Sequence, residues 1–315
     1  MTLSRHILGI LALVGFCVAP APGAWSASLE SESLGELRQR LQGEWLQSDK
    51  EWSSQQTKPF SVYADVKSDI NVSESRFQLQ GVNFDSLRQY LSEARNWCEI
   101  MLLHLNVKSC VHRQDEGSEM LDLYLGRKYA QTPGESTRID FQFYSRGADD
   151  VFQARLHADQ GPYGTSDYRF ELNAIPAGEQ VFVKLRLSNR VGYAEKLADV
   201  YLNTLGRFKV GFTYVGKDLF GRPKFVKGRL GAAERNVVRY MLALETALSD
   251  TDADFMVWAG RWFEATEEYP KQLREMARKD YMSVKTTELE NQERLQSATD
   301  RNETISFKPE VEFNK

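Results

Sequence analysis

Hydrophobic side chains occupy every second position through most of the central part of the chain. This alternation is typical of β-strands that bury one face and expose the other. It occurs in seven stretches, at residues 107–111, 121–125, 139–143, 152–156, 168–172, 181–187 and 208–214. Short polar turns separate most of them, so the pattern predicts an antiparallel meander with one dry face and one wet face.

The residues before this meander predict a helix, a strand pair and a second helix. Residues 29–47 carry apolar side chains at spacings of three to five, which indicates a short amphipathic helix. Residues 60–81 alternate around a polar turn at 71–74, so we expect a hairpin or one long bent strand there. Residues 83–104 return to helical spacing, with Trp97 and Cys98 on the apolar face.

The segments after residue 190 follow helical periods. Helices are expected at 192–205 and at 231–249, the second with an apolar stripe that includes Met241 and Leu244. Residues 255–281 are rich in aromatic side chains, Pro270 divides them into two helices, and a charged stretch follows at 285–301. Because exposed aromatic side chains would form a large apolar patch, we expect them to cover the protein's own core rather than to dock onto a partner.

The first 26 residues have the pattern of a secretory signal peptide. A short basic head precedes an apolar run at 7–19, and small residues near position 26 fit cleavage after Ser26. The run is shorter than the roughly 20 residues of a membrane anchor, and the bulky Phe16 before Cys17 fits a lipoprotein signal poorly. We therefore expect an exported, soluble mature protein, most naturally in a bacterial periplasm.

Export gives the two cysteines of the mature chain a structural meaning. Cys98 and Cys110 lie twelve positions apart, and in an oxidising compartment such a pair is expected to form a disulfide. The bond would link a helix to the strand after it. The alternative is a redox-active dithiol, but the two-residue spacing of that motif is missing.

Composition narrows the chemistry that the chain can perform. Its 315 residues carry 40 Lys and Arg against 44 Asp and Glu, a net charge of −4, which argues against a nucleic-acid partner. With only four histidines and three cysteines, a zinc or iron–sulfur site is not expected. Neither a Gly-x-Ser-x-Gly motif nor a phosphate-binding loop occurs. We therefore name no metal ligand, cofactor or catalytic residue, and interpret His104, His112 and His157 as structural or surface histidines.

The order of these elements resembles the helix-grip fold of the START and polyketide-cyclase-like superfamily. Three segments within residues 60–250 carry the resemblance: the helix that ends in Trp-Cys-Glu-Ile at 97–100, the alternating strands, and residues 231–240, which open the long helix. It implies an α+β domain in which a curved antiparallel sheet of about seven strands packs on a long C-terminal helix. The chain would then divide into a signal peptide (1–26), a helix and linker (27–59), the helix-grip domain (60–250) and a helical extension (251–315).

Members of that superfamily mostly enclose a hydrophobic cavity between sheet and helix. The resemblance therefore implies an exported binder or carrier of a lipid or another hydrophobic small molecule. A convergent acid–base pair in the same cavity would instead indicate a cyclase-like or hydrolase-like enzyme. The aromatic helix could alternatively serve a non-catalytic envelope interaction protein, and a transient contact with a membrane or an envelope protein is a further expectation.

Inward strand positions and the helix stripe supply candidate cavity walls, although the same side chains could simply pack against one another. These candidates are Phe141, Phe143, Phe170, Phe212, Met241 and Leu244.

Four arginines are candidates for contact with a ligand headgroup. Arg169 and Arg186 lie on strands, where the alternative is a set of cross-strand ion pairs on a solvated face. Arg235 and Arg239 are four residues apart on one helical edge. They could clamp an anionic headgroup at the cavity mouth, or they could pair with carboxylates of the sheet.

Overall fold

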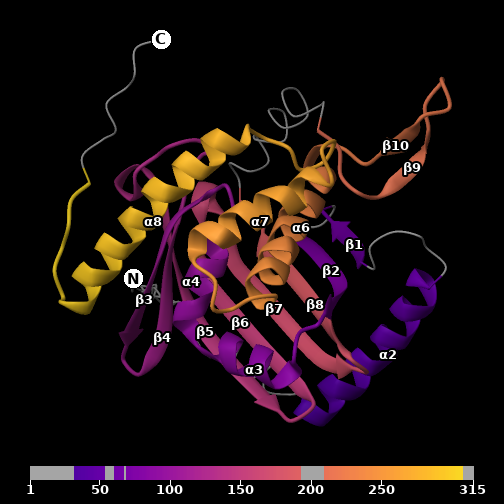
Figure 1. Ribbon diagram of the computed structural model, residues 1–315, viewed down its shortest axis with the longest axis horizontal. Coiled ribbons are helices and arrows are strands. Elements are labelled where there is room, and N and C mark those ends of the chain that lie inside the picture. The colour runs from indigo at the N-terminus through magenta and orange to yellow at the C-terminus, as the bar shows by residue number, and fades with distance from the viewer. Residues whose placement is uncertain (1–31, 54–59, 67–68, 193–208, 308–315) are drawn as a thin grey trace, which may run out of the picture.

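The structure is a computed structural model that describes residues 32–53, 60–66, 69–192 and 209–307. The expected signal peptide, and all but the first residue of the helix expected at 192–205, lie outside the described residues. An eight-stranded antiparallel sheet forms the centre of the molecule, with helices packed on one of its faces (Figure 1). The α+β helix-grip fold expected from the order of elements is confirmed.

Every pair of neighbouring strands in the large sheet is antiparallel, in the order β1-β2-β8-β7-β6-β5-β4-β3. The pairing of β2 with β8 joins the first hairpin to the last strand of the meander. The strands are β1 (Phe60–Asp65), β2 (Ile70–Gln80), β3 (Val107–Asp115), β4 (Ser118–Leu125), β5 (Thr137–Ala148), β6 (Val151–Gln160), β7 (Ser166–Ala177) and β8 (Gln180–Arg190).

The expected strands differ from the observed ones at the ends of the set. The hairpin predicted at 60–81 is confirmed by β1 and β2, but the turn predicted at 71–74 is wrong, because these residues belong to β2. Six of the seven alternating stretches form β3 to β8. The seventh, 208–214, is wrong as a strand of this sheet. The carboxylate of Glu234 accepts the backbone N–H groups of Phe212 and Thr213, and Tyr214 instead begins a separate hairpin of β9 (Tyr214–Lys217) and β10 (Pro223–Phe225).

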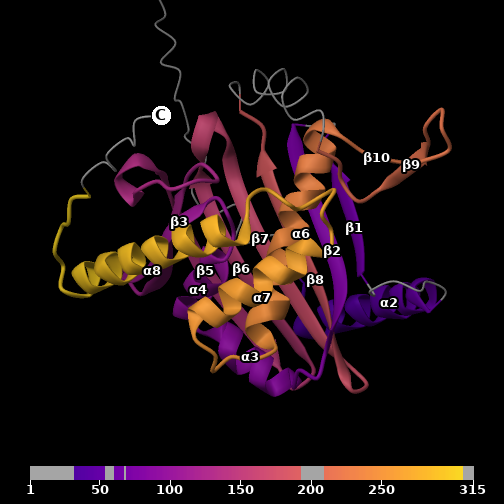
Figure 2. The ribbon, with the colours of Figure 1, turned by 45° about the horizontal axis from the view of Figure 1, so that its top comes forward.

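Three helices cover the concave face of the sheet directly, and a fourth, α7, packs over α6 (Figure 2). They are α3 (Phe84–Ser92), α4 (Ala94–Leu102), α6 (Gly228–Leu248) and α7 (Phe255–Glu267). Helix α6 packs on β1, β2 and β8, while α4 packs on β3 and β4. Among the described residues, no helix combines the length and the apolar character needed to cross a bilayer.

The outer face of the sheet is partly dry, which corrects the expectation of a fully wet face. Helix α2 (Leu34–Trp52) begins with a capping box formed by Ser33 and Glu36, and it packs across β6 and β7. Its residues Leu37 and Leu41 are fully buried against Ile175 and Phe182 of the sheet. The fold therefore has a second, smaller core on the outer face.

The last helix, α8 (Arg278–Asp300), lies along the edge strand β3. The side chain of Gln292 accepts the N–H of Cys110, and the side chain of Gln296 both accepts the N–H of His112 and donates to its carbonyl. These bonds satisfy backbone groups that an edge strand would otherwise leave open to another chain. The helix therefore acts as a cover for the sheet edge.

The division of the aromatic segment at Pro270 is confirmed, because α7 ends at Glu267 and α8 begins at Arg278. The expectation that its aromatic side chains cover the protein's own core is also confirmed. Trp258 and Trp262 are each 1% exposed, and Trp262 stacks on Tyr281 of α8.

The expected disulfide between Cys98 and Cys110 is present, with 4.9 Å between the two Cα atoms. It links the middle of α4 to β3, so it holds the helix against the strand that follows it.

Candidate functional site

A cavity of about 640 Å³ lies between the concave face of the sheet and α6. Its volume falls in the range of small-molecule binding sites. The sheet wall comes from strands β2 to β8, and the helix wall comes from positions 229, 232, 233, 236 and 240 of α6, which share one face at helical spacing.

The deeper part of the cavity is apolar. Its wall is formed by inward residues of the strands, together with Met101 from α4. They include Leu123, Ile139, Phe141, Leu156 and Phe170. Such a lining favours the hydrocarbon part of a ligand over water.

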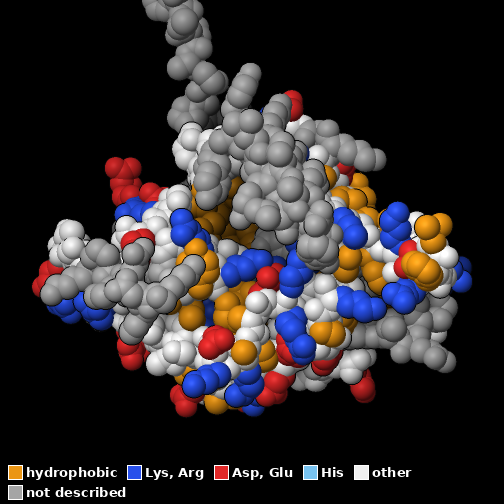
Figure 3. All heavy atoms as spheres, turned by 90° about the horizontal axis from the view of Figure 1, so that it is seen from above, with side chains coloured by type: hydrophobic (Ala, Val, Ile, Leu, Met, Phe, Trp, Pro, Cys, Tyr) orange, Lys and Arg blue, Asp and Glu red, His pale blue; other side chains and the backbone are white. Residues whose placement is uncertain are grey.

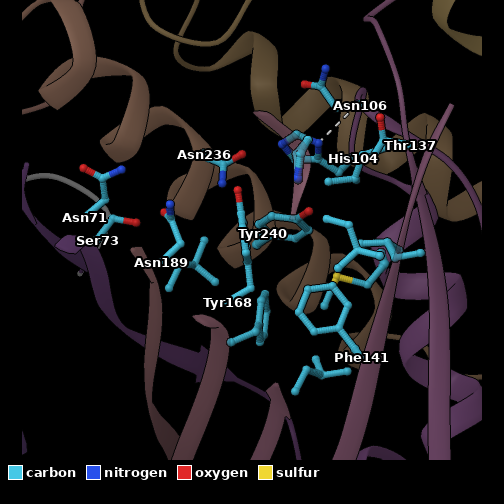
Figure 4. A pocket seen from close by; sticks show the side chains of 18 of the residues that line it. Asn71, Ser73, His104, Asn106, Thr137, Phe141, Tyr168, Asn189, Asn236 and Tyr240 are labelled. Atoms are coloured by element: carbon cyan, nitrogen blue, oxygen red, sulfur yellow. Dashed lines mark hydrogen bonds between the residues drawn. The ribbon is translucent and has the colours of Figure 1, made fainter. Parts of the chain in front are cut away.

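The rim of the cavity is polar (Figure 4). Asn71, Ser73, Asn189 and Asn236 gather on one side, and Asn106 and Thr137 lie near His104 on the other, with Phe141 below them. Seen from above, this end of the molecule is hollowed, with hydrophobic side chains inside the hollow and Lys and Arg side chains beside it (Figure 3). The cavity therefore offers polar contacts at the rim and apolar contacts below.

His104 is the most informative polar residue in the lining. Its ring stacks on Tyr240 with centroids 4.6 Å apart, and its Nδ1 accepts the backbone N–H of Asn106 at 3.2 Å. A neutral imidazole that accepts at Nδ1 carries its proton on Nε2. Nε2 is fully buried and has no partner within hydrogen-bond geometry among the described residues, although the side chain of Asn236 is close enough to act on the ring. His104 therefore places a buried polar side chain in the cavity wall, next to Asn236.

The surroundings keep this imidazole neutral. Burial lowers the pKa of His104 well below its usual value, and the nearby cations Arg239, Lys285 and Lys128 lower it further, while Asn236 opposes the shift. Burial also raises the pKa of the Tyr240 hydroxyl, so that side chain stays protonated as well. Near neutral pH the imidazole is therefore neutral and the hydroxyl protonated.

Helix α8 fixes the turn that carries His104. The Tyr281 hydroxyl donates to the Leu103 carbonyl at 3.0 Å, and Lys285 donates to the His104 carbonyl at 2.9 Å. The Lys285 ammonium also binds Glu288 at 2.6 Å, and Glu288 in turn binds Lys108 of β3 at 2.6 Å. All three charged side chains are almost fully buried. The position of the cavity's donor therefore depends on a helix beyond the helix-grip core.

The sequence alone did not single out His104 as a binding residue. It was interpreted, like the other two histidines, as structural or surface. The signal was its place directly after an apolar helix, between Leu103 and Leu105, where a polar side chain is buried and must face either a partner or a cavity.

The predicted wall residues divide into two groups. Phe141 and Phe170 line the cavity. Phe143, Met241 and Leu244 are buried in the surrounding core and are not part of the lining.

Phe212 lies away from the cavity lining. It is partly buried and packs edge-on against Phe60 and Tyr269. Its displacement follows from the loss of the strand expected at 208–214, since only a strand of the sheet would have aimed this side chain inward.

The two strand arginines direct their charges away from the cavity interior. Arg169 contributes to the rim, but its guanidinium forms two hydrogen bonds with Asp167, at 2.8 and 2.9 Å. Arg186 lies on the outer face, 3.6 Å from Glu74, because it alternates with the inward Leu185. The expectation that Arg186 faces the cavity is therefore wrong, and the cross-strand ion pair is the correct alternative.

Arg235 and Arg239 are on the side of α6 that faces away from the cavity, so they form no clamp at its mouth. Arg239 binds Glu275 at 2.7 Å, and Lys128 binds the same carboxylate at 2.8 Å. Arg235 donates to the Val210 carbonyl, and burial lowers its pKa to about 10. Pairing with a carboxylate is thus correct for Arg239, although the carboxylate comes from the segment between α7 and α8.

The lining contains few acidic side chains. Of the described residues in the lining, Glu135 is the sole carboxylate, and its side chain caps the turn at Thr132. The part of the chain that the structure describes holds no group of three or more metal-ligating side chains.

No family model and no curated protein matches this chain. Among solved structures, truncated norcoclaurine synthase from Thalictrum flavum is 16% identical, with 45% of this chain and 89% of that chain covered and a TM-score of 0.31. Human STARD10 is 8% identical, with 49% of this chain and 67% of that chain covered and a TM-score of 0.34. The di-domain ARO/CYC StfQ of the steffimycin biosynthetic pathway is 14% identical, with 58% of this chain and 51% of that chain covered and a TM-score of 0.35. These scores are low, so the fold assignment here rests on strand order and helix placement instead.

Proposed function

We propose that this protein is an exported carrier that holds a lipid or another hydrophobic small molecule between its sheet and α6. The observation that carries the proposal is the 640 Å³ cavity with an apolar interior and a polar rim. A ligand in an apolar space of this size would gain many dispersion contacts with the lining.

The bound molecule would be amphipathic. Its hydrocarbon part would lie against Phe141, Leu156 and Phe170, and an oxygen acceptor would meet the Nε2–H of His104. A neutral donor suits a carbonyl, ester, hydroxyl or carboxylate oxygen. Satisfying a buried donor that otherwise has no partner adds selectivity for ligands with such an oxygen.

The proposal of export rests on the first 26 residues and is supported by the disulfide. Disulfides persist in oxidising compartments and are rare in a reducing cytosol. The mature protein purified from its source should therefore begin at Ala27, which N-terminal sequencing would establish.

A fluorescence titration with a dansyl-labelled fatty acid tests binding in the cavity. The mature protein should enhance and blue-shift the emission, and an unlabelled fatty acid should reverse the change. Ala233→Trp places a large ring in the cavity from α6 and should weaken binding by about tenfold or more. Ala148→Trp adds the same ring at an exposed position of β5 and should leave binding unchanged. Equal affinities of the two folded variants would refute the cavity as the binding site.

A further inference from the structure

The tip of the β9–β10 hairpin exposes two large apolar side chains. Leu219 is 101% exposed and Phe220 is 82% exposed. They occupy the corner of the turn closed by the hydrogen bond from Gly221 N to the Asp218 carbonyl. Corners of turns usually carry small or polar residues, so an exposed Leu-Phe pair at this position calls for a binding partner.

The same hairpin is strongly cationic. Residues 214–227 carry four exposed basic side chains and one acidic residue, whereas the whole chain has a net charge of −4. The basic residues are Lys217, Arg222, Lys224 and Lys227. The acidic one, Asp218, is occupied within the turn, where its carboxylate accepts the N–H groups of Phe220 and Arg222.

The hairpin is held firmly where it leaves the body of the protein. Glu234 of α6 is 1% exposed, and its carboxylate accepts two backbone N–H groups and the Thr213 hydroxyl. Below the hairpin, Gly211 and Thr213 exchange backbone hydrogen bonds with Val226. The tip therefore stands out from the molecule in a defined direction (Figures 1 and 2).

We infer that this hairpin docks the protein onto a membrane that contains anionic lipid. Leu219 and Phe220 would enter the boundary between headgroups and acyl chains, and the surrounding Lys and Arg side chains would bind the negative surface. Two side chains at a single corner are too few for a stable protein interface, which requires about 800 Å² on each partner. A corner is, in contrast, a suitable shape for shallow insertion between lipids.

Docking of this hairpin would bring the cavity rim close to the membrane. Strand β10 leads within three residues to the start of α6, whose Arg229 lines the rim and binds Asn71 at 2.7 Å. The inference stands on the hairpin alone and does not require any particular cavity ligand.

Vesicle flotation with the mature full-length protein tests the inference. Vesicles of phosphatidylcholine mixed with phosphatidylglycerol should bind the protein, and vesicles of phosphatidylcholine alone should bind it much less. The double variant Leu219→Ser and Phe220→Ser should lose about tenfold or more of its binding to the anionic vesicles. Lys217→Gln with Lys224→Gln should lose roughly fivefold for each charge removed, and high salt should abolish the difference from wild type.

Matched substitutions elsewhere separate the hairpin from general surface effects. Leu46→Ser with Tyr144→Ser removes a leucine and an aromatic side chain that are also exposed, by 57% and 54%, on α2 and β5. Lys50→Gln with Lys279→Gln removes two other exposed cations. Both controls should float like wild type. Unchanged flotation of the hairpin variants, or an equal loss in the controls, would overturn the inference. A wild-type protein that binds neither kind of vesicle would also overturn it and would favour a protein partner for the tip.

Discussion

His104 places a hydrogen-bond donor where the cavity changes from polar to apolar. Its Nδ1 is occupied by the Asn106 backbone, so the proton on Nε2 is the one that we propose a ligand oxygen accepts. The stacked Tyr240 ring and the carbonyl bond from Lys285 leave the imidazole little freedom to turn away. A donor held in this way costs little entropy when a ligand binds.

Replacement of His104 by Phe should change ligand selectivity. Phe keeps a ring against Tyr240 but has no N–H to donate. We expect affinity for a fatty acid to fall by about tenfold, the equivalent of one hydrogen bond, while affinity for an alkane of similar length stays within about twofold. Competition against the dansyl probe measures both on the same variant, so a general packing defect would appear as an equal loss for the two ligands.

His104 should also make the stability of the protein depend on pH. Its pKa is well below 6.5 in the folded protein and near 6.5 in the unfolded chain. Between these values the unfolded state binds a proton that the folded state does not, so the free energy of unfolding decreases as the pH falls. The loss is about 1.4 kcal/mol for each pH unit below 6.5, and the group contributes no pH dependence well above pH 7.

Urea denaturation at pH 7, 6 and 5 measures this effect. The folded variant His104→Gln retains the other titrating groups and should show a shallower decrease than wild type over the same interval. Identical pH profiles would contradict the assignment of His104 as buried and neutral.

Helix α8 is joined to the sheet edge through buried charge rather than through an apolar stripe. Glu288 lies between Lys108 and Lys285, and the two ammonium groups also donate to backbone carbonyls of the 104–107 turn. Burial and the neighbouring Lys108 lower the pKa of Lys285 to about 8. The cluster stabilises the fold only as a complete set, because removal of its one carboxylate would leave two buried cations.

Glu288→Leu should therefore destabilise the protein by about 3–5 kcal/mol. The triple variant Lys108→Met, Lys285→Met and Glu288→Leu replaces all charges by apolar groups of similar size, and it should regain most of that loss. Urea denaturation of the three proteins measures the free energies. A single variant as stable as wild type would show that the cluster does not hold α8 in place.

The elements were predictable to different degrees, and the reasons are physical. Strands β3 to β8 were correctly predicted because the side chains of each strand alternate between the apolar core and the opposite face of the sheet. The role of α8 was not predicted, since a helix that uses Gln, Lys and Glu side chains to bind a strand edge has the pattern of a solvated helix. The stretch 208–214 alternates like a strand but is bound by Glu234, a contact 22 positions away that no local pattern contains.

At the scale of the whole molecule, the arrangement of the chain was more predictable than its site. Element order alone predicts a sheet that grips a long helix. Of the predicted site residues, Phe141 and Phe170 line the cavity. Both occupy inward-facing positions on strands that form its wall. Arg186, Arg235 and Arg239 do not line the cavity, because charge on a strand or helix identifies a face but not the residues that pack against it.

The helices beyond residue 250 complete the fold rather than extend it. Helix α7 covers α6 with Trp258 and Trp262, and α8 closes the β3 edge and holds the His104 turn. A chain that ends at Ser249 should lose cooperative unfolding and precipitate or bind hydrophobic dyes. A chain that ends at Arg301 keeps both helices and should melt like the full protein. A stable, cooperative 27–249 fragment would contradict this view.

The carrier function requires that the cavity hold a ligand in the native protein. The most direct test is gentle purification of the mature protein from its source, followed by solvent extraction and mass spectrometry of the bound material. We predict a stoichiometric amphipathic molecule with an oxygen-containing end, which is absent from an equally purified Ala233→Trp variant. A protein that is empty and that also takes up no labelled fatty acid would contradict the carrier function, although it would leave the fold unchanged.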